Sequence, residues 1–177
     1  MYRIRRSIDV GFSHHIRGHG GACINLHGHT WKLEVGVEAP TLDAQGFVVD
    51  FGVLSREVLR PCHALLDHSL AVGETTYAEV AGDLERLGTN LLESRRELHG
   101  HIDTTGREVV RLDGAETRYP GGLKVTVFPF SPTSERLAEW LYGLAASRLE
   151  DDRVRVAYGR IYETLHPVES VAEYRPR

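Results

Sequence analysis

A chain of 177 residues is long enough to bury the core of one globular domain, and 41% hydrophobic with 26% charged residues is an ordinary composition for such a domain. The formal net charge of -4 argues against a general nucleic-acid binder, and no apolar run approaches the length of a membrane span. Two cysteines make no disulfide scaffold and the first residues lack the apolar stretch of a secretory signal, so we expect a cytoplasmic protein.

The first predicted element is a half-buried strand from Tyr2 to His14. Its apolar residues alternate, and His14 ends it on the apolar face. A histidine in that position, taken alone, is more often a core residue bonded to backbone. His15 points the opposite way. A glycine-rich turn at 17–22 makes this strand the antiparallel neighbour of the next one.

The second predicted strand, from about Cys23 to Val37, carries two histidines of the same parity. Because side chains alternate along a strand, His27 and His29 lie side by side on the face that also carries Trp31. Two such imidazoles can hold one metal ion if a third ligand arrives from a neighbouring strand. His14 is that candidate, and the second strand therefore favours a metal ligand over a core histidine.

After a turn region the chain predicts a short strand at 47–51 and a helix from about Val53 to Leu66. Pro61 interrupts the helical pattern and should kink the helix or end it early. Asp67 and His68 stand at its end. An acid beside an imidazole is weak evidence by itself, because histidines are common at helix ends.

The segment from about 71 to 124 is poor in side chains with chemical function, so we expect a surface excursion outside the catalytic site. Tyr77 to Leu98 has apolar residues at helical spacing, although Gly82 and Gly88 would divide it into two shorter helices. Two strands should follow, at 109–112 and 123–128.

A second clear helix is predicted over 131–149, since Pro132, the neighbouring hydroxyls and Glu135 are all signals of a helix N-terminus. The last predicted strand covers 153–164 and contains Glu163. An ordinary exposed glutamate would be the simplest explanation of that residue. Together the elements predict an α+β domain with an antiparallel sheet and two main helices on one face.

An ordered set of these residues resembles the 6-pyruvoyltetrahydropterin synthase / 6-carboxytetrahydropterin synthase family. Each motif is unspecific alone, but the order agrees throughout, over residues 2–70 and 126–174. The set is His14, Cys23, His27-Gly28-His29, Asp50-Phe51, Leu66-Asp67-His68, Pro132-Thr133-Ser134-Glu135 and Glu163-Thr164.

The resemblance implies a zinc enzyme that acts on dihydroneopterin triphosphate. His14, His27 and His29 match the three zinc ligands, and the open fourth position would receive the side-chain hydroxyls of the substrate, which zinc acidifies as a Lewis acid. The family adopts the tunnelling fold, in which the sheets of several subunits join in a barrel and sites lie at subunit boundaries. A homo-oligomer, by resemblance a hexamer, with no nucleic-acid or membrane partner is therefore expected.

The resemblance also assigns the proton chemistry and the pterin contacts. Cys23 matches the residue whose thiolate takes a proton from the substrate side chain, and Asp67 and His68 match the partners that accept and relay it. Glu163 matches the carboxylate that grips the amino-pyrimidine edge of the pterin through two parallel hydrogen bonds. Two further residues would line the same pocket, Glu135 and Thr164.

The first ligand and the long middle segment depart from the family's pattern. Setting the first strand against the family's run gives His14 as the ligand, and His15 in that role would break strand parity with Phe12. The segment at about 71–124 is far longer than the matching loop of the short bacterial enzymes. We therefore expect a single domain over 1–177 with an insertion there.

Two alternatives remain open. In the first, Cys23 and the three histidines complete a closed structural zinc site, and the chain is a binding module without catalysis; the acid–imidazole pair and Glu163 would then have no purpose. In the second, a relative of the same fold makes the pyruvoyl product. The bacterial-style match around Asp67-His68 favours the carboxy product, 6-carboxy-5,6,7,8-tetrahydropterin, formed with loss of triphosphate and acetaldehyde in queuosine biosynthesis.

Overall fold

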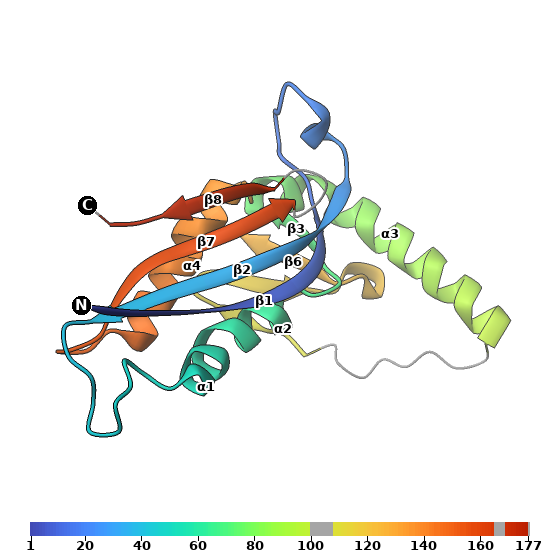
Figure 1. The fold of residues 1–177 in the computed structure, drawn as a ribbon. Helices are drawn as coiled ribbons and strands as arrows, with labels where there is room; N and C mark the ends of the chain where they lie inside the picture. Colours follow the sequence, from blue (N-terminus) through green and yellow to red (C-terminus); the bar gives the residue numbers. More distant parts are fainter. Residues whose placement is uncertain (100–107, 165–168, 177) are drawn as a thin grey trace.

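The computed structural model describes residues 1–99, 108–164 and 169–176, and these residues form one eight-stranded sheet with the order β4-β5-β6-β3-β1-β2-β7-β8 (Figure 1). The strands are β1 (Tyr2–His14), β2 (His27–Ala39), β3 (Leu70–Gly73), β4 (Arg111–Leu112), β5 (Ala115–Arg118), β6 (Val125–Phe128), β7 (Arg155–Thr164) and β8 (Ser170–Tyr174). The helices are α1 (Phe51–Leu54), the π-helical turn η2 (Ser55–Leu59), α2 (Arg60–Leu66), α3 (Glu74–His99) and α4 (Ser134–Leu149), with short 3-10 turns η1 (Ala22–Ile24) and η3 (Pro120–Gly122).

A long antiparallel hairpin of β1 and β2 forms the centre of the sheet. Its register places His14 opposite His27 and Phe12 opposite His29. β2 continues antiparallel to β7, and β7 to β8. In this half of the sheet the predicted antiparallel arrangement is confirmed. The register places the C-terminal end of β1 beside the N-terminal end of β2.

β3 makes the sheet mixed, so the prediction of an antiparallel sheet is wrong for this strand. β3 pairs in parallel with β1 on one side and with β6 on the other. Parallel neighbours need a long crossover, which α3 and the β4–β5 hairpin provide between β3 and β6. The 71–124 segment is thus not the expected surface excursion, because β3 lies inside the sheet. Residues 100–107 of that segment lie outside the described residues.

The helices α2 and α4 cover the face of the sheet that carries the histidines. The alternate residues of β2 from Trp31 to Val37 are fully buried and belong to one apolar cluster with residues of both helices. Gly159 of β7 lets α4 approach closely, because a Cβ there would lie 2.7 Å from the carbonyl oxygen of Ala138. The predicted α+β class with two main helices on one face is confirmed.

The helix α3 packs on the opposite face, over β3 and β6 (Figure 1). The second apolar cluster there consists of Val72, Leu84, Val125 and Val127. The expected division into two helices is wrong, since α3 runs without a break through Gly82 and Gly88. Gly88 fits because η3 touches the helix at that point: a Cβ there would lie 2.6 Å from the carbonyl oxygen of Gly121.

Helix capping determines the secondary structure of the chain between β2 and α2. The predicted strand at 47–51 does not form, because Asp50 is the N-cap of α1 and its Oδ1 accepts a hydrogen bond from the Gly52 N–H at 2.5 Å. The predicted helix over 53–66 does form, beginning at Phe51. Pro61 lies in the first turn of α2 directly after the π-helical turn, where a missing N–H is tolerated.

The other end of the chain matches its predicted elements closely, with one addition. The helix expected over 131–149 begins at Ser134 with Thr133 as its N-cap. The strand expected at 153–164 is β7, and β8 was not predicted. Within the residues that the structure describes, no helix has the length and apolar character needed to cross a membrane.

The two glycines of α3 should respond in opposite ways to alanine. Gly82→Ala meets no atom within 4 Å and should raise the free energy of unfolding by about 0.5–1 kcal/mol, because alanine has the higher helix propensity. Gly88→Ala forces a methyl group against the backbone of η3 and should lower it by roughly 1–3 kcal/mol. Urea unfolding of both variants measures the difference. Equal shifts in the same direction would show that η3 does not pack against α3 in solution.

Candidate metal and substrate site

Three imidazoles gather where the β1–β2 hairpin ends. The ring centroid of His14 lies 4.5 Å from that of His27 and 5.7 Å from that of His29. Trp31 stands edge-on to His14 and His29 and stacks on Phe12 at 4.5 Å, so the cluster has a rigid aromatic floor. His14 is only 1% exposed. The hairpin register and the floor hold the three rings around one point.

Backbone carbonyls fix the orientation of two of these rings. His14 Nδ1 lies 3.1 Å from the carbonyl oxygen of Pro132, and His27 Nδ1 lies 2.8 Å from that of Asn25. A carbonyl oxygen only accepts hydrogen bonds, so in the neutral rings each Nδ1 donates and each Nε2 presents a lone pair. The two Nε2 atoms face each other at 2.9 Å. Two lone pairs at this distance repel unless a cation lies between them.

The third ring and a carboxylate complete the cluster. His29 Nε2 is buried and has no hydrogen-bond partner, and burial lowers the pKa of His29, which keeps its imidazole neutral near pH 7. Glu163 Oε1 lies 3.4 Å from His14 Nε2 and 3.5 Å from His29 Nε2. The nearby His14 ring and the hydroxyl of Ser134 lower the pKa of Glu163 to about 2, so its carboxylate is ionised.

These four side chains fit a zinc ion. The candidate ligand atoms of His14, His27, His29 and Glu163 all lie within 4.8 Å of one another. Neutral imidazole nitrogens and carboxylate oxygens are common zinc ligands, and carbonyl groups on the far nitrogens are the usual orienting partners. Cys23, the fourth ligand in the structural-zinc alternative, does not belong to this group among the described residues.

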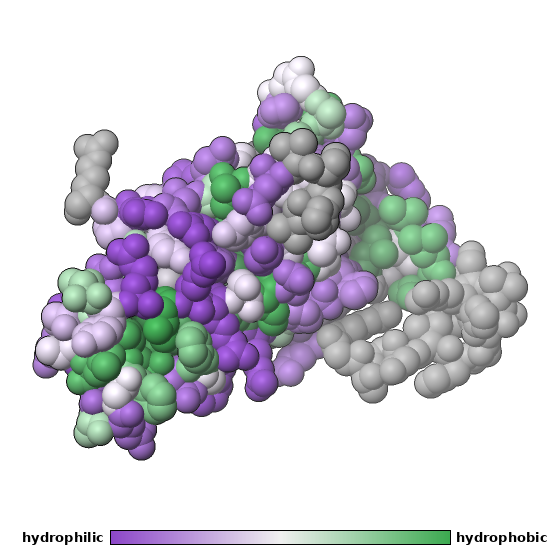
Figure 2. Space-filling view, in the orientation of Figure 1, coloured by the Kyte–Doolittle hydropathy of each residue, from purple (hydrophilic) through white to green (hydrophobic). Residues whose placement is uncertain are grey.

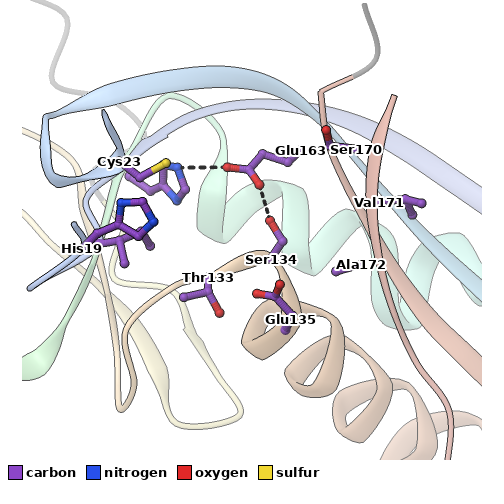
Figure 3. A pocket seen from close by; sticks show the side chains of 11 residues that line it. His19, Cys23, Thr133, Ser134, Glu135, Glu163, Ser170, Val171 and Ala172 are labelled. Carbon is purple, nitrogen blue, oxygen red and sulfur yellow. Dashed lines mark hydrogen bonds and ion pairs between the residues drawn. The ribbon is translucent and has the colours of Figure 1, made fainter. Parts of the chain in front are cut away.

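A cavity of about 320 Å³ opens beside the cluster (Figure 3). The loop between β1 and β2 contributes His19 and Cys23, the N-terminus of α4 contributes Thr133, Ser134 and Glu135, and β8 contributes Ser170, Val171 and Ala172. His14 and Glu163 form its inner wall. Glu163 reaches in from β7, and its Oε2 accepts a hydrogen bond from Ser134 Oγ at 2.5 Å. Segments distant in the sequence therefore meet in one cavity.

The structure brings most, but not all, of the predicted site residues to this cavity. His14, Cys23, Glu135 and Glu163 line it, next to His27 and His29. Thr164 pairs with Ser170 at the end of β7 and is not among the lining residues. His15, the other candidate for the first ligand, lines a separate cavity against α3.

The Asp67–His68 pair lies apart from Cys23. His68 lines a different cavity, together with Lys124, and its side chain is 89% exposed. Its Nδ1 lies 2.8 Å from Asp67 Oδ2. Partial burial would raise the pKa of Asp67, but the His68 hydrogen bond and the charge of His63 outweigh it and lower that pKa. The lowered pKa keeps Asp67 ionised, and within one chain the pair does not share the Cys23 cavity.

Ser134 makes a contact that the sequence does not predict. The sequence predicts only that the hydroxyls of this segment cap a helix, and Ser134 is the first residue of that helix, α4. Thr133 caps the helix instead, by accepting from the Arg136 N–H at 3.3 Å. Ser134 is thereby free to hold Glu163, and only the packing of α4 against β7 reveals that contact.

Comparisons with known proteins identify one family. The family model described as 6-pyruvoyl tetrahydropterin synthase matches residues 3–177. The chain is 37% identical over 70 residues to the 6-carboxy-5,6,7,8-tetrahydropterin synthase of Rickettsia typhi. That match covers 40% of this chain and only 51% of the Rickettsia protein, so it spans about half of the relative's length.

Two solved structures share the fold over nearly the whole chain. The uncharacterized protein WS1659 from Wolinella succinogenes superposes with a TM-score of 0.70 at 23% identity, covering 99% of this chain and 98% of that one. The 6-pyruvoyl tetrahydropterin synthase of Caenorhabditis elegans gives a TM-score of 0.56 at 14% identity, covering 99% and 96%. At these identities the likeness concerns the fold, and it confirms the predicted tunnelling type.

The zinc assignment predicts which histidines control metal content. His27→Ala removes one of three converging imidazoles and should weaken zinc binding at least ~10-fold. His19→Ala changes a histidine that lines the same cavity outside the ligand group, and His15→Ala changes the rival first ligand. Both controls should retain zinc in metal analysis of the purified proteins. Full retention by His27→Ala would contradict the assignment.

Proposed function

Because the chain belongs to the 6-pyruvoyl tetrahydropterin synthase family, we propose that it is a zinc-dependent lyase that makes 6-carboxy-5,6,7,8-tetrahydropterin. The substrate would be 7,8-dihydroneopterin triphosphate, and triphosphate and acetaldehyde would leave. The observation that carries this proposal is a cavity lined by His14, a thiol and two carboxylates, directly beside the other two imidazoles of the ligand group. Such a cavity offers ligands for a metal, a proton acceptor and polar side chains that can bind a ring.

The chemistry divides between the metal and the side chains around it. Zinc held by His14, His27 and His29 would supply Lewis acidity toward the hydroxyls of the substrate side chain. Cys23, half-buried in the wall of the same cavity, would take a proton from that side chain and return it. The buried Phe12 and Trp31 rings shield one side of the cluster from water, which strengthens charge interactions on that side.

The pterin ring would be held by the acidic side of the cavity. Glu163 is ionised and partly exposed to the cavity, which suits two parallel hydrogen bonds from the amino-pyrimidine edge. Glu135 lies on the first turn of α4 at the same wall. Thr164, next along β7, would support the strand end rather than touch the ring.

The proton relay requires a second copy of the chain. Asp67 and His68 lie outside the cavity of Cys23 in the same chain, and the His68 side chain is exposed. We therefore propose a homo-oligomer, by family resemblance a hexamer, in which this pair completes the site of a neighbouring copy. The arrangement also explains why the imidazole of this pair is exposed in one chain.

The carboxy product is favoured over the pyruvoyl product. The Rickettsia relative carries the carboxy name, and Cys23 suits a synthase. The proposal places the protein in the cytoplasm, in queuosine biosynthesis, without nucleic-acid or membrane partners. We further propose a single domain over 1–177 with an insertion at about 71–124, because no lining residue of the Cys23 cavity comes from that segment in the described part of the chain.

The products of the reaction and one variant test the proposed chemistry. Wild-type protein incubated with 7,8-dihydroneopterin triphosphate should release triphosphate and acetaldehyde in equal amounts. Cys23→Ala should keep zinc but lose turnover by roughly a hundredfold or more, because the general base is removed. Cys62→Ala is a matched control, since this buried thiol packs in the apolar core and its pKa is raised to about 12 by burial.

Each failure has a separate meaning. Triphosphate without acetaldehyde would identify the pyruvoyl product. Neither product from a zinc-loaded protein would favour the binding-module alternative. Normal turnover of Cys23→Ala would remove the thiol from the mechanism while leaving the reaction in place.

Mixed oligomers test whether the relay acts between copies. Cys23→Ala and His68→Ala should each be inactive as pure proteins. Co-expressed in equal amounts, they should recover about a quarter of the wild-type sites, because a site then combines an intact Cys23 with an intact His68 from a neighbour. A relay within one chain would give no recovery, because every chain of the mixture carries one defect.

A further inference from the structure

We propose that Glu163 is an exchangeable fourth ligand of the zinc ion, which closes the metal site in the resting protein and opens it when a pterin ring binds. The inference rests on the proposed function for the identity of the ring. It adds a role that the resemblance does not give to Glu163, because the family pattern leaves the fourth position open. The ring would thus gate access to the metal.

The positions of the ligand atoms support a fourth ligand. With zinc–nitrogen and zinc–oxygen bonds of about 2.0–2.1 Å, the corners of a tetrahedral site lie about 3.3 Å apart. Glu163 Oε1 lies 3.4 Å from His14 Nε2 and 3.5 Å from His29 Nε2. Its carboxylate oxygen therefore already stands at the distance of a tetrahedral corner from two imidazole ligands.

The second oxygen of the same carboxylate is tethered. Ser134 Oγ at the start of α4 donates to Glu163 Oε2 at 2.5 Å, and this bond turns Oε1 toward the imidazoles (Figure 3). The side chain is 24% exposed and faces the cavity, so a ligand can reach it. Among the described residues, no other carboxylate belongs to the ligand group, although Glu135 lines the same cavity.

The two tasks of Glu163 compete for one carboxylate. Two parallel hydrogen bonds to an amino-pyrimidine edge need both carboxylate oxygens in the plane of the ring. In the resting arrangement one oxygen is held by Ser134 and the other faces the imidazoles. A bound ring therefore competes with the metal for Oε1, and the hydroxyls attached to that ring take the fourth position when Oε1 turns to the ring. A small ligand without the ring makes no such contact with the carboxylate.

The experiment measures zinc affinity and the binding of small ligands to the metal, not turnover. Glu163→Gln should weaken zinc binding at least ~10-fold in competition with a chelator, while Glu135→Gln, which removes the same charge from the same cavity, should stay within about twofold of wild type. In cobalt-substituted protein, sodium azide should change the visible spectrum of Glu163→Gln and leave wild type and Glu135→Gln unchanged. Neopterin, which has the ring and the hydroxyls without phosphates, should change the wild-type spectrum.

The outcomes separate this proposal from the reaction. Azide binding to wild type at the concentration that saturates Glu163→Gln would overturn the role of Glu163 as a fourth ligand. Equal zinc affinities of wild type and Glu163→Gln would also overturn it, whichever reaction the enzyme catalyses. Ser134→Ala gives a second variant: it keeps the carboxylate but removes the tether, and it should admit azide at concentrations between those for wild type and Glu163→Gln. A cobalt spectrum of Ser134→Ala identical to wild type in azide would count against the tether. If the azide results are as expected but the enzyme forms no products from the pterin substrate, only the proposed reaction is overturned.

Discussion

Two imidazoles that face each other across one hairpin are the constraint on which the rest of the structure depends. The Nε2 atoms of His14 and His27 lie 2.9 Å apart, and carbonyl groups on the far side of each ring prevent either from turning away. Because both Nδ1 atoms face carbonyl oxygens, the two Nε2 atoms are directed toward one point between the rings. Backbone geometry therefore sets the orientation of both imidazoles.

The parts that hold this pair come from distant segments. The carbonyl that orients His14 belongs to Pro132, just before α4, and α4 reaches the sheet because Gly159 leaves room for it. The same helix start supplies Ser134, which turns Glu163 toward the imidazoles. One packing contact thus positions His14, its carbonyl partner and the carboxylate opposite. Loosening α4 would disturb all three together.

The Asp67–His68 pair is fixed by backbone contacts at the end of α2. His68 has a left-handed backbone with φ 56°, a conformation that is uncommon for residues other than glycine, and its N–H donates to the Gly11 carbonyl oxygen at 2.8 Å. Lys124 Nζ donates to the carbonyl groups of Ala64 and Asp67 at 2.9 and 2.7 Å, which secures the end of α2. These contacts fix the backbone of His68, while its imidazole remains exposed.

The sequence alone determined what depends on local periodicity. Alternation along β1 and β2 was enough to put the three histidines on one face, and the family resemblance then singled out Glu163. Tertiary structure decided the rest. β3 pairs in parallel with segments far along the chain, Asp50 caps a helix instead of joining a strand, and Cys23 is separated from its expected relay. Neighbouring residues fix a pleat or a helical turn, whereas long-range pairing and side-chain direction depend on contacts that form only when the whole sheet assembles.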